Sequence, residues 1–190
     1  MSQEAESYEI GDWIVHRHHG VGQITATRTS DISGKPVTYY EIETVDSTIW
    51  IPVDQLTEDV LRPILTPQEM REVVSVLQRP PRDMDTRYSA RKLRIYRTQK
   101  DGLPVAMARL VRDMRARQEK RGRLSNTEQD ALRSLTRKLL QEWAVCKGIS
   151  IEMAQERLNT LLQEAETEAN GAVPASVAET GNETAVGLQE

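Results

Sequence analysis

The spacing of apolar residues changes once along this chain, near residue 63. Up to that point, short runs alternate between apolar and polar residues and are separated by turns that contain glycine or serine. A two-residue period is typical of strands that bury one face. From residue 66 onward, apolar residues recur every three or four positions, which indicates amphipathic helices. The pattern therefore predicts an α+β protein, with a strand-rich first part and an all-α second part.

Four strand-like runs predict a small antiparallel β-barrel: residues 13–16, 23–29, 37–43 and 48–53. Because the runs are short and the turns between them are tight, a Tudor-like or SH3-like barrel fits them best. We expect this domain to span residues 8–62, after a flexible lead at residues 1–7. Its expected core consists of apolar and aromatic residues of these runs: Trp13, Val15, Ile24, Tyr40, Ile42, Ile49 and Ile51.

The second part begins with a clear helix signal. Thr66-Pro67-Gln68-Glu69 combines a capping box with proline at the first helical position, and Pro80-Pro81 ends the helix that follows. We expect residues 63–165 to form one helical domain of four to five helices, with a hinge near 79–83. An acidic, disordered tail is expected at residues 166–190. The later helices are predicted at about residues 85–98, 103–120, 126–147 and 150–162.

The predicted helix at residues 103–120 combines an apolar face with several arginines. Five of its apolar residues are expected to point inward: Leu103, Met107, Leu110, Val111 and Met114. Its arginines are expected to point mostly outward: Arg109, Arg112, Arg115 and Arg117.

Charge is distributed unevenly along the chain, whose net charge is −4. Residues 1–62 hold 4 basic and 11 acidic side chains, residues 63–164 hold 21 and 13, and residues 165–190 hold none and 5. Residues 79–123, the basic segment, hold 15 Lys and Arg against 5 Asp and Glu. Such segregation is typical of separate modules with separate partners.

The basic segment favours a polyanionic partner. Arg87, Arg91 and Arg94 follow the spacing of one helical stripe, and acidic residues at helical spacing are scarce around them. A charged helix face is usually only solvated, but the size of this excess favours nucleic acid. No helix-turn-helix or finger pattern is visible, so reading of base sequence is not indicated.

No catalytic or cofactor-binding motif is visible. The chain has no glycine-rich nucleotide loop, nucleophile elbow or metalloprotease motif. His16, His18 and His19 are the only histidines, and adjacent strand residues point to opposite faces, so a metal site is disfavoured. Cys146 has no base in its own module and is interpreted as a structural thiol. With no membrane-spanning run and no signal peptide, we expect a cytoplasmic, non-enzymatic protein without cofactors or metals.

Several short motifs stand out in both parts of the chain. The first part contains Gly11-Asp12-Trp13-Ile14-Val15, His18-His19-Gly20, Thr27-Arg28-Thr29, Tyr40-Glu41-Ile42 and Ile51-Pro52. The second part contains Thr86-Arg87-Tyr88, Val111-Arg112-Asp113-Met114 and Leu124-Ser125 before a long helix. Together they resemble the CarD/CdnL family of bacterial transcription regulators, over about residues 8–162. The same barrel also begins a module of the transcription-repair coupling helicase, so the helical half favours the CarD-like assignment.

This resemblance implies a Tudor-like module that binds the β subunit of RNA polymerase. It also implies a helical domain that contacts promoter DNA, double-stranded or forked, at the upstream edge of the transcription bubble. There the protein would stabilise the open complex, as a monomer associated with the nucleoid through polymerase. Motif matching implies that Arg28 contacts polymerase and that Arg87 faces DNA. Local helical geometry adds Arg91, Lys92 and Arg94 to the DNA-facing set.

Two positions depart from the family pattern. Met84 stands where the family usually has a tryptophan that wedges against the minor groove, and methionine can also enter a base step. Trp50 stands where a second polymerase-contacting basic residue occurs, so we assign it to the polymerase-binding face, although the sequence fits a core position equally well. The alternative function is an adaptor that binds proteins through both modules, without DNA.

Overall fold

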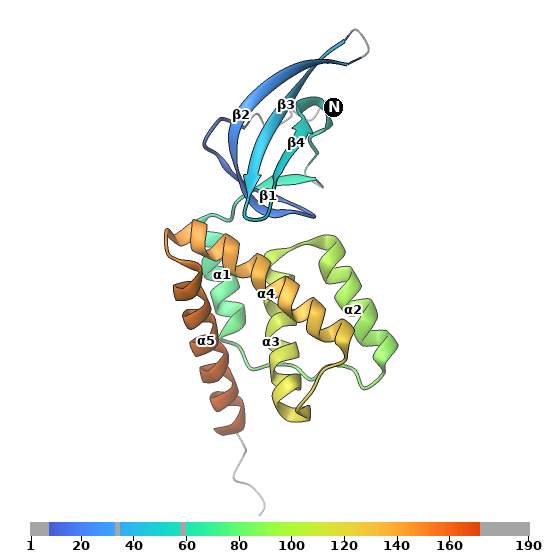
Figure 1. Ribbon diagram of the computed structural model, residues 1–190. Helices are drawn as coiled ribbons and strands as arrows, with labels where there is room; N and C mark the ends of the chain where they lie inside the picture. Colours follow the sequence, from blue (N-terminus) through green and yellow to red (C-terminus); the bar gives the residue numbers. More distant parts are fainter. Residues whose placement is uncertain (1–7, 33–34, 58–59, 172–190) are drawn as a thin grey trace, which may run out of the picture.

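The computed structural model describes residues 8–32, 35–57 and 60–171 of the chain. An N-terminal antiparallel sheet lies at one end of a helical domain (Figure 1). The sheet has the strand order β4-β3-β2-β1-β5. Its strands are β1 (Trp13–His16), β2 (Gly20–Ile32), β3 (Lys35–Thr44), β4 (Thr48–Pro52) and β5 (Leu61–Pro63). The α+β class with an N-terminal Tudor-like unit is confirmed, and the three-residue strand β5 was not expected.

The sheet buries the face of β1 opposite to the one expected. Ile14 is fully buried, whereas Trp13 is 40 % exposed and Val15 is half-buried. Successive strand residues point to opposite faces, so placing Ile14 in the core turns both neighbours outward. Ile49 is half-buried at the edge of the cluster. The buried cluster consists of Ile14, Ile24, Tyr40, Ile42, Ile51 and Leu61.

The β2–β3 hairpin packs closely at Gly22. A Cβ added there would lie 2.7 Å from Ile42 Cγ2 and 3.0 Å from the carbonyl oxygen of Glu43. Only glycine therefore fits without a shift of the neighbouring strand. A bulge between Ile24 and Ala26 changes the register farther along the hairpin.

Within the described residues, five α-helices follow, after a 3-10 turn at Val53–Gln55. They are α1 (Pro67–Leu77), α2 (Tyr88–Asp101), α3 (Pro104–Arg121), α4 (Asn126–Lys147) and α5 (Ile151–Gly171). The expected capping box at Thr66 and Glu69 begins α1, and a second, at Ser125 and Glu128, begins α4. Helices α2, α3 and α4 each end at a glycine in the left-handed conformation: Gly102, Gly122 and Gly148.

Three details of the helical part correct the sequence-based expectations. Helix α2 begins at Tyr88 rather than near residue 85, because Arg87 is still extended at its N-cap. Helix α5 continues to Gly171, so the tail expected from residue 166 is helical at its start, and residues 172–190 lie outside the described ranges. Leu103 is the N-cap of α3 and is 59 % exposed rather than buried.

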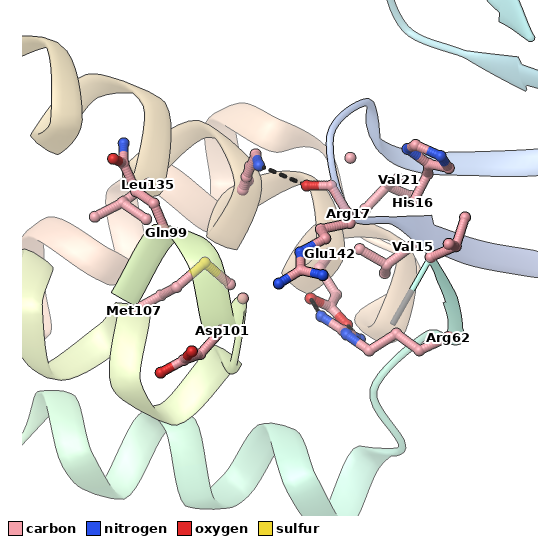
Figure 2. Close-up of a pocket in the computed structure, with 14 residues that line it drawn as sticks. Val15, His16, Arg17, Val21, Arg62, Gln99, Asp101, Met107, Leu135 and Glu142 are labelled. Carbon is pink, nitrogen blue, oxygen red and sulfur yellow. Dashed lines mark hydrogen bonds and ion pairs between the residues drawn. The ribbon is translucent and has the colours of Figure 1, made fainter. Parts of the chain in front are cut away.

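Sheet and helices are joined by specific polar contacts across a small cleft (Figure 2). Arg62 on β5 donates to both carboxylate oxygens of Glu142 on α4, at 2.6 and 2.8 Å. Glu142 Oε1 also accepts from the backbone N–H of Leu65, at 3.0 Å. Lys138 Nζ donates to the carbonyl oxygen of Arg17, and the Arg17 guanidinium donates to the carbonyl oxygen of Lys100. These contacts set how the helical domain is oriented on the sheet.

Candidate protein and nucleic-acid interfaces

Arg28 and Trp50 lie on the same outer face of the sheet, on either side of Glu41. Glu41 on β3 is opposite Trp50 on β4. Tyr39, two residues before Glu41 and on the same face of β3, is opposite Arg28 on β2. The Arg28 guanidinium forms an ion pair with the Glu41 carboxylate. The Arg28 side chain is 69 % exposed, and Trp50 is 58 % exposed. Trp50 is therefore a surface residue and not part of the core.

The basic segment divides into surface cations and structural cations. Arg91 and Arg112 are buried, whereas Arg94, Arg115 and Arg117 are half-buried. The remaining ten are exposed: Arg79, Arg82, Arg87, Lys92, Arg97, Lys100, Arg109, Lys120, Arg121 and Arg123. Most of the positive charge thus lies on the surface, as expected. Of the predicted stripe of Arg87, Arg91 and Arg94, however, only Arg87 is exposed.

Arg91 is a structural residue, which corrects its assignment as a DNA contact. It is 7 % exposed, and its Nε donates to Glu128 Oε1 at 2.6 Å. Its Nη1 donates to the carbonyl oxygens of Asp85 and Thr86, at 2.9 and 2.7 Å. These bonds hold the extended segment before α2 against the first turn of α4. The Arg91 guanidinium therefore binds groups within the protein.

Glu128 connects this arginine to a helix cap. Its Oε2 accepts from the backbone N–H and the hydroxyl of Ser125, at 3.0 and 2.7 Å, while Oε1 accepts from Arg91. Burial opposes ionisation of Glu128, but the hydrogen bonds from Ser125 and Arg91 outweigh it and lower the pKa of this carboxyl. The carboxylate is therefore charged and serves both contacts at once.

Asp113 on α3 binds two of the remaining arginines. This carboxylate is 1 % exposed and accepts from Arg112 at 2.8 and 3.0 Å and from Arg94 at 2.5 Å. Arg112 also donates to the carbonyl oxygen of Val76 on α1, at 2.9 Å. Arg112 was expected to point outward, and this buried carboxylate explains why it does not. Arg94 is half-buried and paired, so it offers less charge to a partner than expected.

Arg87 and Lys92 are the predicted DNA-facing cations that lie on the surface. The Arg87 side chain is 78 % exposed and pairs with Asp85 at 3.2 Å. Lys92 is exposed and has no ion-pair partner within the part of the chain that the structure describes. Both lie near the start of α2, on the same helix as Arg97 and Lys100.

Met84 is buried, which corrects its expected position against a DNA fork. It is 8 % exposed and belongs to a cluster that includes Ile95, Met114 and Leu135. An apolar side chain packed in this way would have to leave the core to enter a base step. The structure therefore does not present Met84 as a wedge.

The three histidines lie together at a hydrogen-bonded turn. His16 Nδ1 accepts from the backbone N–H groups of His18 and His19, each at 3.1 Å. Burial, reinforced by the nearby His19, His18 and Lys138, lowers the pKa of His16 from 6.5 to about 4. Among the described residues, no group of three His, Cys, Asp or Glu side chains is arranged to hold a metal ion.

Two further sequence-based observations have structural counterparts. Cys146 is half-buried beside the core of α1, α4 and α5, and burial raises the pKa of its thiol, which makes it a weaker nucleophile.

No helix within residues 8–32, 35–57 and 60–171 is both long and apolar enough to cross a membrane.

The outer face of α2 carries large side chains whose exposure was not predicted from the sequence. Tyr88 is 45 %, Leu93 is 48 % and Tyr96 is 60 % exposed. The signal was present in the sequence, because Tyr88, Lys92, Tyr96 and Lys100 are spaced four residues apart.

Two family models match the chain. The CarD-like/TRCF RID domain matches residues 8–65, which contain the sheet with Arg28 and Trp50. The CarD C-terminal domain matches residues 72–159, which contain most of the helical domain and the whole basic segment. The two matches follow one another in the order of the two structural parts.

Proposed function

This chain belongs to the CarD family, and on that premise we propose that it regulates transcription initiation by binding RNA polymerase and promoter DNA at the same time. The sheet binds the β subunit of RNA polymerase, and the basic helical domain contacts DNA near the upstream fork of the bubble. The protein thereby stabilises the open complex without catalysing a reaction. The single observation that carries this proposal is that an exposed Arg28–Trp50 face on one module occurs together with ten exposed cations in the basic segment of the other.

The polymerase contact is proposed at the outer face of the sheet. Arg28 offers a charged side chain, and Trp50 offers a large ring. Arginine and tryptophan are both enriched in interface hot spots. Glu41 holds Arg28 in place beside Trp50. A partner surface with an acidic residue next to an apolar pocket would fit this pair.

The DNA contact is proposed for the surface cations and excludes Arg91 and Met84. Arg87 and Lys92 can reach phosphate oxygens without breaking a buried ion pair. Such contacts are independent of sequence, since phosphates are the same at every base pair. Intrinsic DNA affinity can be weak, because binding to polymerase raises the effective concentration of the helical domain at the promoter.

The polymerase contact can be tested with purified β subunit. Trp50→Ala should weaken binding about 30-fold, as expected for truncation of a hot-spot tryptophan. Arg28→Glu should weaken it at least as much, because the new charge also lies beside Glu41. Arg157→Glu, an exposed change on α5, should leave binding unchanged. Equal binding by all four proteins would reject the proposed face.

The DNA contact can be tested by the lifetime of open complexes. The wild-type protein should change this lifetime on a promoter, and an Arg87→Glu/Lys92→Glu variant should lose most of the effect while still binding polymerase. Affinity for a forked promoter fragment should fall steeply with salt, with a slope reduced by about 2 in the double variant. If the double variant behaves as the wild type in both assays, an adaptor that does not bind DNA becomes the better interpretation.

A further inference from the structure

The exposed side of α2 combines aromatic rings and cations in one regular row. Tyr88, Lys92, Tyr96 and Lys100, the α2 stripe, are each four residues apart and therefore follow one ridge of the helix. All four are exposed, while Ile95 and Thr98 on the opposite side pack against the domain. Leu93 and Arg97 continue the same surface on the next ridge.

This row is unusual for the outside of an amphipathic helix. A single exposed apolar residue needs no explanation, but three large ones on one 14-residue helix form a patch. In Figure 1, α2 lies at the edge of the helical domain, on the side away from α5. Tyr88 contacts α4 but is still 45 % exposed, and Tyr96 is 60 % exposed, so the stripe is available to a partner.

Tyr88 is held in position from one side. Its hydroxyl bonds with Thr127 Oγ1 at 3.2 Å, and the guanidinium carbon of Arg91 lies 5.7 Å from its ring centroid. Arg91 is itself fixed by Glu128, so the ring rests on a rigid support. A ring that is already oriented loses little conformational freedom on binding.

Rings alternating with cations suit one chemical class of ligand. Stacking on aromatic side chains requires the flat face of a base, and within a duplex those faces are already stacked on their neighbours. Cations between the rings can pair with the phosphates that connect successive bases. Tyr88 and Tyr96 are eight residues apart, which corresponds to a rise of about 12 Å. That span fits about three to four stacked nucleotides of one strand.

We infer that the α2 stripe binds single-stranded DNA by stacking its tyrosines on unpaired bases. The inference rests on the proposed function and deepens it, because the edge of a transcription bubble is where unpaired bases lie beside duplex. Arg87 and the exposed cations outside the stripe would contact duplex phosphates, and Lys92 lies where the duplex phosphates meet those of the separated strand that the stripe would hold.

The test compares a fluorescently labelled oligothymidine of twelve nucleotides with a blunt duplex in anisotropy titrations at one salt concentration. Tyr96→Ala should lower affinity for the single strand about 5- to 150-fold, the range for loss of one stacked base, and leave duplex affinity unchanged. Tyr96→Phe should retain affinity because the ring is kept. Trp13→Ala removes another exposed aromatic residue, from the sheet, and should change neither affinity.

Each alternative result has a separate meaning. An equal loss on both DNAs would overturn stacking and leave DNA binding by the helical domain intact. Unchanged DNA binding by Tyr96→Ala, with weaker capture of polymerase, would identify a protein-binding surface and also overturn the inference. If the wild type binds the duplex but not the single strand, the inference alone fails. If it binds neither DNA and also leaves the open-complex lifetime unchanged while still binding polymerase, the proposed DNA contact fails as well. Tyr96 is on the surface, so equal melting temperatures would exclude misfolding as the cause.

Discussion

Arg62 and Glu142 join the sheet to the helices through two hydrogen bonds between residues 80 positions apart in the sequence. Glu142 is 1 % exposed, so its charge depends on Arg62 and on the N–H of Leu65. Breaking one side of a buried ion pair leaves an uncompensated charge. This pair therefore contributes both to stability and to the mutual orientation of the two parts.

Removal of the Arg62 charge should destabilise the whole protein. Arg62→Met is expected to lower the free energy of unfolding by about 3 kcal/mol, measured by urea denaturation. Adding Glu142→Gln should restore much of the loss, because the amide oxygen still accepts from Leu65 and no charge is buried. A double variant as unstable as Arg62→Met would show that the unpaired charge is not the cause.

Arg91 and Lys92 are neighbours with opposite expected roles. Arg91→Ala leaves Glu128 buried without its closest cation and should cost about 3 kcal/mol of stability, with Arg117 at 3.5 Å as a partial substitute. Lys92→Ala should change stability by less than about 0.5 kcal/mol and should weaken DNA binding. Thermal and urea unfolding, together with DNA titrations, measure both effects. A stable Arg91→Ala protein with reduced DNA affinity would restore Arg91 as a DNA contact.

His16 should make stability depend on pH in a defined window. Its pKa in the folded protein is about 4, below the ordinary value of 6.5, so the unfolded chain takes up a proton first as pH falls. The contribution is complete above pH 6.5 and decreases toward pH 4, by up to about 3 kcal/mol. His16→Asn, whose side-chain oxygen can accept the same backbone bonds, should flatten the profile in this window. His18→Asn, at an exposed position, should retain the slope.

Gly22 tests how tightly the β2–β3 hairpin is packed. Gly22→Ala brings a methyl group within 2.7 Å of Ile42 Cγ2, so the strands must separate. We expect a loss of about 1–3 kcal/mol in unfolding free energy. Polymerase binding should also weaken, because Arg28 on β2 and Trp50 on β4 are held together through β3. Gln23→Ala, at the next residue, is the matched control. A fully stable Gly22→Ala protein would contradict the close packing.

Local signals in the sequence predicted most of the secondary structure. The capping boxes at Thr66 and Ser125 formed as expected, because each requires only residues three positions apart. The face of β1 was predicted wrongly, since its four residues contain apolar side chains at successive positions and fit either register. Packing of Ile14 against the other strands decides that choice.

The candidate sites were predicted less completely than the fold. Arg28 and Trp50 both lie on the surface of the sheet, although from the sequence Trp50 fitted a core position equally well. The excess of surface charge on the helices was expected. Arg91 and Arg112 were assigned outward positions from helical spacing, and Met84 from its match to the family's tryptophan position, whereas all three are buried. Helical spacing shows which residues share a face but not which face meets another helix.

By itself the sequence determined the two-part organisation, the helix boundaries near their caps and the separation of acidic from basic segments. These depend on residue type and on neighbours within a few positions along the chain. Only the tertiary structure decided which cations remain available. Arg91 finds Glu128 37 residues away, and Arg62 finds Glu142 80 residues away. A buried carboxylate binds whichever cation the packing brings near it, and that proximity is not encoded in local spacing.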